Sequence, residues 1–426
     1  MTLVVFLVAL ISAVIIGMPI AFSLLFSGVA IMIYLNDFNS MILSMNLFAG
    51  ADSFALMAIP FFILAGEFMN RGGITKRIVN FANALVGHIR GGLAYVSIIA
   101  ILLFAAMIGS AVASTAALGG ILIPMMTRAN YNREKATGLI AAGNILSPIM
   151  PPSVPLIIFG VQAGVSITNL FIAGIAPAIY LTIVLCLTWY FVSKKDDLPT
   201  NNRQSLKDVM KALLDGLWAI LLPAFILVGL RSGLFTPTEA GVIAAVYALF
   251  VGLFVYRELK FSDLLDCFVV SAKSASVIMF LAAAATVSSW LLTVGNVPQI
   301  MTDVLEPFIE QPTILMLIIA VLVVLIGMAM DVTPIIMILT PVLLPVIEAA
   351  GIDPIYFGVV FVLMCMIGLL TPPVGNVLNV ASKTGNISME RMVKAVWPFL
   401  LAEIVLILLL ILFPQLIEIP LSLFGG

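Results

Sequence analysis

Four short interruptions in otherwise apolar stretches carry the residues of this sequence that can do chemistry. The first is GSAVAST at Gly109–Thr115, where Ser110, Ser114 and Thr115 offer hydroxyl groups among small residues. Hydroxyl oxygens and unpaired backbone carbonyls are suitable ligands for Na⁺ inside a membrane protein. The segment is therefore a candidate cradle for Na⁺ or for a substrate. Close helix packing through small residues is the alternative.

The second interruption is SPIMPPS at Ser147–Ser153, and Asn144 lies just before it. Proline lacks an N–H group and cannot continue a helix, so backbone carbonyls are left unpaired before the proline pair. These carbonyls, together with the side chains of Asn144, Ser147 and Ser153, are hard oxygen ligands that suit Na⁺. A simple proline kink is the alternative, but the motif TPPVG repeats the feature later in the chain.

The third and fourth interruptions lie at Gly327–Pro334 and Gly368–Gly375. Asp331 is the one carboxylate that we expect deep in such an interruption, and an ionisable residue inside a membrane is a functional candidate by default. It can ligate Na⁺, carry a proton or bind a substrate hydroxyl. Equally, it can cap the following helix by accepting hydrogen bonds from its first N–H groups.

The composition identifies the kind of protein in which these interruptions occur. Of 426 residues, 63% are hydrophobic and 9% are charged, whereas a soluble domain has about 25% charged residues. The chain is therefore expected to be an all-α, multi-pass membrane protein. It has no basic patch for nucleic acid and no cysteine pattern for a disulfide framework or metal site, and no removable signal peptide is expected.

The apolar and polar stretches divide the chain into two similar halves, at 1–192 and 212–426, joined by a basic connector at 193–211. Each half is expected to contain crossings, an amphipathic surface arm, a broken hairpin, a broken helix and a final crossing. In the first half these are crossings at 2–35 and 53–70, the arm 71–90, the hairpin 92–127, the broken helix 136–165 and the crossing 170–192. In the second half they are crossings at 213–231, 236–257 and 276–294, the arm 296–311, the hairpin 314–348, the broken helix 354–380 and the crossing 396–420.

Matching glycines and prolines support an internal repeat. Pro19 corresponds to Pro237, Gly73 to Gly295, Gly109 to Gly327 and Pro151-Pro152 to Pro372-Pro373 at nearly constant offsets. The first arm contains four Lys or Arg residues and the second contains only acidic charges, so the first is expected on the cytoplasmic side and the second on the periplasmic side. Residues 2–35, interrupted at Gly17-Met18-Pro19, can be one long tilted helix or two short ones. Tracing them as one crossing makes the halves an inverted repeat with two re-entrant hairpins. It also puts the N-terminus in the cytoplasm and the C-terminus in the periplasm.

No enzyme site or ATP-driven engine is evident. The sole histidine, His88, lies on the first arm, and no nucleophile–base pair, metal-ligand spacing or P-loop is present. Helix N-termini, expected near Ala116 and Ile335 and after the proline breaks, carry positive dipole ends that suit an anion. Three further carboxylates fall near crossing ends and are expected to face the interface or a partner: Glu67, Glu239 and Glu403.

Five motifs together resemble the large membrane subunit of tripartite ATP-independent periplasmic (TRAP) transporters. They are GSAVAST with Pro124, PPSVPLIIFG at 151–160, TPTEAG at 236–241, DVTPIIMILTPVLLP at 331–345, and GIDPIYFGVV with IGLLTPPVG within 351–375. The resemblance implies an elevator-type fold in the bacterial inner membrane and Na⁺-coupled uptake of an organic acid. It also implies a separate small membrane subunit and a periplasmic substrate-binding protein as partners, with Na⁺ as the coupling ion and no cofactor.

The Na⁺ sites of that family lie where the hairpin tips face the broken helices. On this sequence the first site matches Gly109, Ser110, Ser114, Asn144, Ser147 and Pro148, and the second matches Gly327, Thr333, Gly368 and Thr371. We expect the substrate beside Thr115, Pro152, Ser153, Asp331 and Pro373. By overall similarity the expected substrate is sialic acid, followed by a C4-dicarboxylate. A stand-alone Na⁺/dicarboxylate-type symporter is the alternative, and a channel or an intramembrane enzyme is the alternative from another class.

Overall fold

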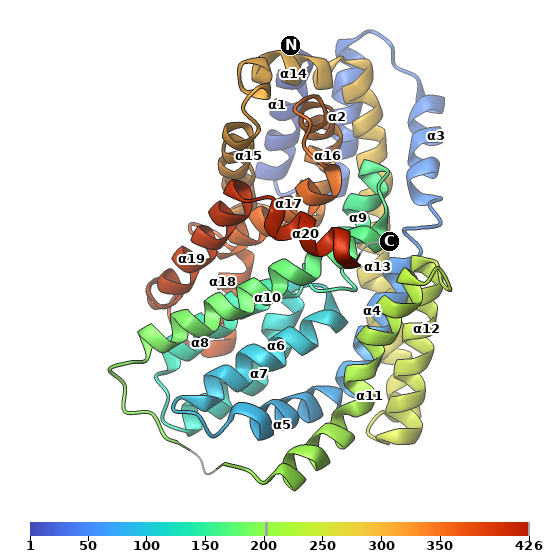
Figure 1. Cartoon of the computed structure of the whole chain (residues 1–426). Helices are drawn as coiled ribbons and strands as arrows, with labels where there is room; N and C mark the ends of the chain where they lie inside the picture. Colours follow the sequence, from blue (N-terminus) through green and yellow to red (C-terminus); the bar gives the residue numbers. More distant parts are fainter. Residues whose placement is uncertain (201–202, 425–426) are drawn as a thin grey trace.

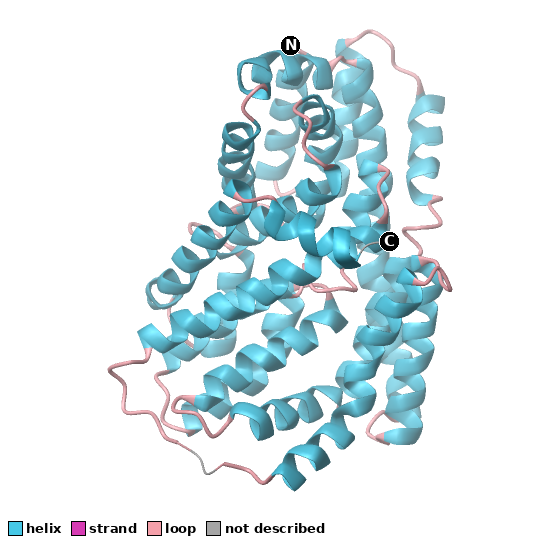
Figure 2. Cartoon of the chain, viewed as in Figure 1, coloured by secondary structure: helices cyan, strands magenta, loops and turns pink. Residues whose placement is uncertain are grey.

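The computed structural model describes residues 1–200 and 203–424, and within them every side chain except those of residues 106–108; residues 201–202 of the predicted connector lie outside it. The described residues form helices and no strands (Figure 2). Seven of the described helices are long and apolar enough to cross a membrane. The prediction of an all-α polytopic membrane protein is confirmed.

The N-terminal stretch is a helical hairpin, so the prediction of a single crossing at 2–35 is wrong. Helix α1 (Thr2–Ile15) ends at Gly17, which has a φ of +90°, and α2 (Ile20–Tyr34) begins after Pro19. Helices of 14 and 15 residues are only about 21–23 Å long, which is too short for a hydrocarbon core of about 30 Å. The chain turns at Gly17, and the two helices pack side by side as a hairpin instead of continuing in one direction.

This hairpin puts the N-terminus at the same end of the molecule as the second arm, α14 (Val297–Ile309) (Figure 1). Thr2 packs against Gly295, immediately before α14. The sequence-based expectations of a cytoplasmic N-terminus and a periplasmic second arm are therefore incompatible. The error arose because a single crossing at 2–35 would have separated the two by the width of the membrane.

After α2, the chain runs toward the opposite end of the molecule through two consecutive helices, α3 (Ser40–Ala51) and α4 (Ala58–Arg71). Only the second of these helices is predicted from the sequence. Helix α3 packs along α13 (Phe261–Val294), where Gly50 lies against Thr286 and Ala283. Helix α13 starts earlier than the predicted crossing at 276–294, because the preceding polar residues are helical too.

The two amphipathic arms lie at opposite ends of the molecule (Figure 1). The first, α5 (Ile74–Val86), buries Ile74 and Ile78, while Lys76 is exposed. Arg77 on α5 donates a hydrogen bond of 2.7 Å to Glu258 and stacks 3.8 Å above the ring of Tyr256. These contacts attach the arm to the segment that follows the twelfth helix.

The two predicted hairpins are present as pairs of helices with nearly the predicted limits. The first consists of α6 (Gly92–Ile108) and α7 (Ala111–Arg128), and the second of α15 (Pro312–Gly327) and α16 (Val332–Ala349). The two ends of the first hairpin lie together, because the Leu93 N–H donates a hydrogen bond to the Tyr131 hydroxyl just beyond α7. Both tips are shorter than the sequence indicated, and Ser114 and Thr115 already lie in the first turns of α7.

Each half also contains the predicted broken helix. The first comprises α8 (Arg133–Gly143), the 3₁₀ turn η1 (Asn144–Leu146) and α9 (Val154–Ala163); the second comprises α17 (Pro354–Leu370) and α18 (Asn376–Gly385). The Pro151-Pro152 and Pro372-Pro373 peptide bonds are both cis. The two broken helices pack on each other, since α9 contacts α17 as well as α16 and the ring of Phe159 covers Gly358.

The remaining helices complete the two halves in the same order. They are α10 (Ile167–Val192), α11 (Leu206–Arg231), α12 (Pro237–Phe250) with the π-helical turn η2 (Val251–Val255), α19 (Met389–Leu412) and α20 (Gln415–Phe424). The predicted crossing at 396–420 ends at Leu412, because Pro414 separates α19 from α20.

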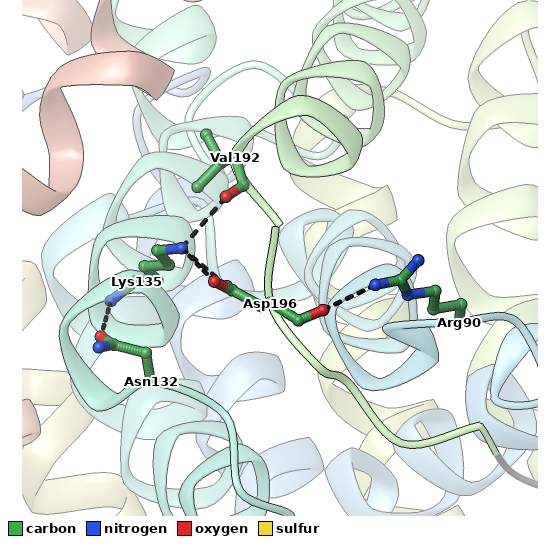
Figure 3. A network of polar contacts seen from close by, with 5 residues as sticks. All are labelled: Arg90, Asn132, Lys135, Val192 and Asp196. Carbon is green, nitrogen blue, oxygen red and sulfur yellow. Dashed lines mark hydrogen bonds and ion pairs between the residues drawn. The ribbon is translucent and has the colours of Figure 1, made fainter. Parts of the chain in front are cut away.

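The start of the connector is held against the first half by one carboxylate (Figure 3). Lys135 on α8 donates hydrogen bonds of 2.7 Å to the Asp196 carboxylate and of 3.1 Å to the Val192 carbonyl. Arg90 donates to the Asp196 carbonyl at 2.8 Å, and Asn132 accepts from the Lys135 N–H at 3.0 Å. Asp196 therefore ties together the end of the arm, the start of α8 and the end of α10.

Candidate functional site

A cavity of about 570 Å³ lies between the two hairpin tips and three helices from elsewhere in the chain. One side is formed by the first tip at Gly109–Ala111, the second tip at Asp331–Pro334, and neighbouring residues of α7 and α9. The other side is formed by the start of α2 and by one face each of α4 and α13. The two interruptions that sequence analysis paired therefore border the same space.

The first hairpin tip consists of two residues, Gly109 and Ser110, and each has a different role in the turn. Gly109 has a φ of +65°, and a Cβ atom there would lie 3.2 Å from the Val154 backbone nitrogen. Ser110 begins α7 by accepting a hydrogen bond from the Ala113 N–H. The tip is thus pressed against the start of α9, and its serine is exposed to the cavity.

Behind this tip lies a buried group of oxygen atoms from α7 and the first broken helix. The Ser147 hydroxyl donates a hydrogen bond of 2.8 Å to the Ser114 hydroxyl, which donates in turn to the Ala111 carbonyl. Asn144 is fully buried and its amide NH₂ donates to the Ile140 carbonyl at 2.7 Å, but its side-chain carbonyl oxygen has no hydrogen-bond partner. Leaving such an acceptor unpaired costs about 1–3 kcal/mol.

This group fits a small monovalent cation better than a transition metal. Its atoms are hydroxyl and amide oxygens, and free carbonyls at a broken helix are typical Na⁺ ligands. Among the residues that the structure describes, no three His, Cys, Asp or Glu side chains come together as a metal cluster. A cation bound here would satisfy the Asn144 oxygen.

The second tip is built on direct backbone contact. A Cβ atom on Gly368 would lie 2.5 Å from the Cα atom of Gly327, so α15 and α17 meet where neither has a side chain. The Gly375 N–H donates to the Met328 carbonyl at 3.2 Å, which joins the tip to the loop after the second proline pair. Thr371 uses its hydroxyl to donate to the Ile367 carbonyl.

Asp331 combines the two roles that its sequence position left open. It is the N-cap of α16, and its carboxylate accepts a hydrogen bond of 2.8 Å from the Val332 N–H. It is also exposed and borders the cavity. One carboxylate oxygen is thus used for the helix, and the side chain still lies where a ligand can reach it.

The predicted site residues fall into three groups. Five border the cavity: Gly109, Ser110, Pro148, Asp331 and Thr333. Six are buried beside it or behind it: Ser114, Thr115, Asn144, Ser147, Pro152 and Ser153. Four belong to the second tip and the second break: Gly327 and Gly368 touch each other, and Thr371 and the exposed Pro373 follow Gly368 in the chain. Of the five predicted substrate neighbours, only Asp331 is part of the cavity lining.

The polar residues on the opposite side of the cavity are not among those predicted from the sequence. These are Glu67 and Asn70 on α4 and Ser274 on α13. Glu67 was expected to face the interface or a partner, and its place in the cavity corrects that expectation. The signal was its spacing with Ile63, Gly66 and Asn70, which puts all four on one face of a helix.

The other two carboxylates differ from each other. Glu239 forms a capping box with Thr236 at the start of α12, as its place near a crossing end allows. Glu403 is not interfacial, because only 1% of it is exposed and neither carboxylate oxygen has a hydrogen-bond partner. It lies in the middle of the buried stripe of α19.

Comparison with known proteins agrees with this architecture. The family model described as "Tripartite ATP-independent periplasmic transporter, DctM component" matches residues 6–416. The 2,3-diketo-L-gulonate TRAP transporter large permease protein YiaN of Escherichia coli (strain K12) is 48% identical, over 99% of each chain. The sialic acid TRAP transporter large permease protein SiaM of Vibrio cholerae is 38% identical, over 94% of this chain and 93% of the relative. The crystal structure of the Alcanivorax borkumensis YdaH transporter shares the fold, with a TM-score of 0.66 at 16% identity over 89% of this chain and 88% of that one.

Proposed function

Because this chain belongs to the DctM family, the large permease subunits of TRAP transporters, we propose that it takes up an organic acid across the bacterial inner membrane, driven by Na⁺ entering with it. A permease of this kind is a transporter and not an enzyme. The family also implies a small membrane subunit and a periplasmic binding protein that delivers the acid.

The observation that carries Na⁺ coupling is the unpaired side-chain oxygen of Asn144. It lies in the buried group with Ser114 and Ser147, behind a tip that borders the cavity. A bound Na⁺ completes this group, and the same ion brings positive charge to a cavity that receives an anion. The contact of Gly327 with Gly368, with Thr371 three residues further along the chain, forms the corresponding second site in this proposal.

The cavity also supports an elevator mechanism. The two hairpins and two broken helices form the moving body, and α2, α4 and α13 belong to the fixed scaffold. The cavity lies between these two sets of helices, so movement of one past the other carries the tips and their cargo across the membrane. With the second arm on the periplasmic side, the N-terminus beside it is periplasmic as well.

The substrate candidates share one chemistry. Sialic acid, expected from sequence, and 2,3-diketo-L-gulonate, for which a relative is named, are both monocarboxylic acids that carry several hydroxyl groups. A C4-dicarboxylate is the other candidate and differs in having two carboxylates and few hydroxyls.

The deciding experiment is uptake by proteoliposomes that contain this chain and its small subunit, with purified binding protein outside. We expect uptake to require both the binding protein and an inward Na⁺ gradient. Uptake by this chain alone would instead identify a stand-alone symporter. Flux that is independent of a Na⁺ gradient would identify a channel and overturn Na⁺ coupling.

A further inference from the structure

The cavity has an acidic scaffold side. Glu67 and Asn70 lie one turn apart on α4, and Ser274 faces the same space from α13. Glu67 is half-buried and has no ion-pair partner among the residues that the structure describes. The nearest cation on its own helix, Arg71, is paired with Asp266 at 3.4 Å. The Glu67 carboxylate is therefore available to a ligand.

The charges around the cavity are unusual for a site that receives an anion. Among the described residues that line it, Glu67 and Asp331 are acidic and none is Lys, Arg or His. Asp331 lies at the second hairpin tip, whereas Glu67 lies on the scaffold. A carboxylate of the substrate consequently has no cationic side chain to pair with on either side.

The first hairpin tip is the better place for a single carboxylate, because the Asp331 carboxylate already lies at the second tip. The first turn of α7 begins at the first tip, and helix N-termini carry partial positive charge. The buried oxygen group of the proposed Na⁺ site also lies behind the first of these tips. A substrate with its carboxylate at the first tip extends its other end toward Glu67, Asn70 and Ser274.

These side chains discriminate between the two substrate chemistries. A hydroxyl group donates a hydrogen bond to the Glu67 carboxylate, which is an acceptor only, and it exchanges hydrogen bonds with an amide or a serine. A second carboxylate meets like charge at Glu67, which disfavours its ionised form. The cavity volume of about 570 Å³ accepts ligands of either size, so charge and not space makes the distinction.

We propose that Glu67, with Asn70 and Ser274, is a scaffold-side selectivity element that admits polyhydroxylated monocarboxylic acids and rejects dicarboxylates. The proposal rests on the proposed function, because it presumes that the cavity receives the transported acid. It adds the substrate class and assigns three residues that sequence analysis did not include in the site.

The test uses the purified membrane complex of this chain and its small subunit, without binding protein, so that the selectivity measured is that of the membrane part. The probes are D-gluconate, a hydroxylated monocarboxylate, and succinate, a C4-dicarboxylate. Affinity is taken from ligand-dependent shifts of the melting temperature in Na⁺ buffer. The wild type is expected to bind gluconate more tightly than succinate.

In Glu67→Gln, succinate affinity is expected to rise about tenfold while gluconate affinity changes less than threefold, because the amide keeps an acceptor and loses the charge. Asn70→Ala is expected to weaken gluconate alone. Glu306→Gln removes an exposed carboxylate on α14, outside the cavity, and is expected to change neither affinity. Variants are compared only if their size-exclusion profiles match the wild type.

A wild-type preference for succinate, an unchanged affinity ratio in Glu67→Gln, or no binding of either acid overturns the proposal. Its failure is separable from failure of Na⁺ coupling. If the ratio shifts as expected but proteoliposome uptake ignores the Na⁺ gradient, the selectivity element stands and Na⁺ coupling falls.

Discussion

At the scale of single residues, Asn144 and Glu403 are two of several buried side chains in the described part of the chain that have an oxygen or nitrogen atom without a hydrogen-bond partner, and the two differ in their surroundings. The Asn144 carbonyl oxygen is a candidate Na⁺ ligand, since the Ser114 and Ser147 hydroxyl groups meet beside the same broken helix. Glu403 has no such neighbourhood of polar contacts, and it interrupts an otherwise apolar stripe of α19. The first is expected to matter for transport and the second for stability.

Replacing Asn144 with Ala should raise the half-saturating Na⁺ concentration for uptake by about tenfold, because one ligand is worth about 1.4 kcal/mol or more. The control is Asn46→Ala on α3, since Asn46 makes the same amide hydrogen bond to the carbonyl four residues back. Ser110→Ala and Thr371→Ala should shift Na⁺ dependence in the same direction. Unchanged Na⁺ dependence in all three would rule out these sites.

Replacing Glu403 with Leu should raise the melting temperature of the purified complex by a few degrees, because a buried unpaired polar group costs about 1–3 kcal/mol. Uptake should be unchanged, since Glu403 does not border the cavity. The control is Glu390→Leu, which removes an exposed carboxylate paired with Lys394 on the same helix. A fall in melting temperature would show that Glu403 has a stabilising partner in the folded protein.

At the scale of elements, glycine pairs determine how closely the hairpins approach the broken helices. The contact of Gly327 with Gly368 lets α15 and α17 touch backbone to backbone, and Gly109 lets the first tip reach the start of α9. Close backbone approach through small residues is a common way to pack membrane helices. Here the same contacts hold the tips beside the cavity, so packing and function depend on the same positions.

Gly368→Ala should lower the melting temperature and abolish uptake, because the new methyl group would overlap the backbone of Gly327 and overpacking costs about 1–3 kcal/mol. The matched control is Gly120→Ala on α7, where no atom lies within 4 Å of the added methyl group. That variant should be as stable as the wild type or slightly more so. Equal behaviour of the two variants would contradict the role of the glycine contact.

At the scale of the whole molecule, the two arms mark opposite ends, and the N-terminus lies at the end marked by α14 (Figure 1). Because α1 and α2 form a hairpin, the first half begins with two antiparallel helices, as the second half does with α11 and α12. The internal repeat is therefore more complete than the sequence indicated.

This arrangement predicts the labelling pattern of single cysteines in intact spheroplasts after Cys186, Cys267 and Cys365 are replaced by Ser. A cysteine added before Met1 and one replacing Glu306 should both react with an impermeant maleimide from outside. Lys76→Cys on the first arm should react only after the membrane is opened. Protection of the N-terminal cysteine together with labelling at position 306 would contradict the hairpin.

Composition and local chemistry alone determined the membrane class, the two hairpins, the two broken helices and the residues at their breaks. Those features depend on apolar length and on glycine and proline, which act on the backbone nearby. Three features were decided only by tertiary structure: the hairpin of α1 and α2, the burial of Glu403 and the place of Glu67 in the cavity. Helical periodicity shows which residues share a face of a helix. In a largely apolar chain, however, the faces that contact lipid, other helices or a cavity carry similar residues. Only the packing of helices distant in sequence decides which of the three a given face meets.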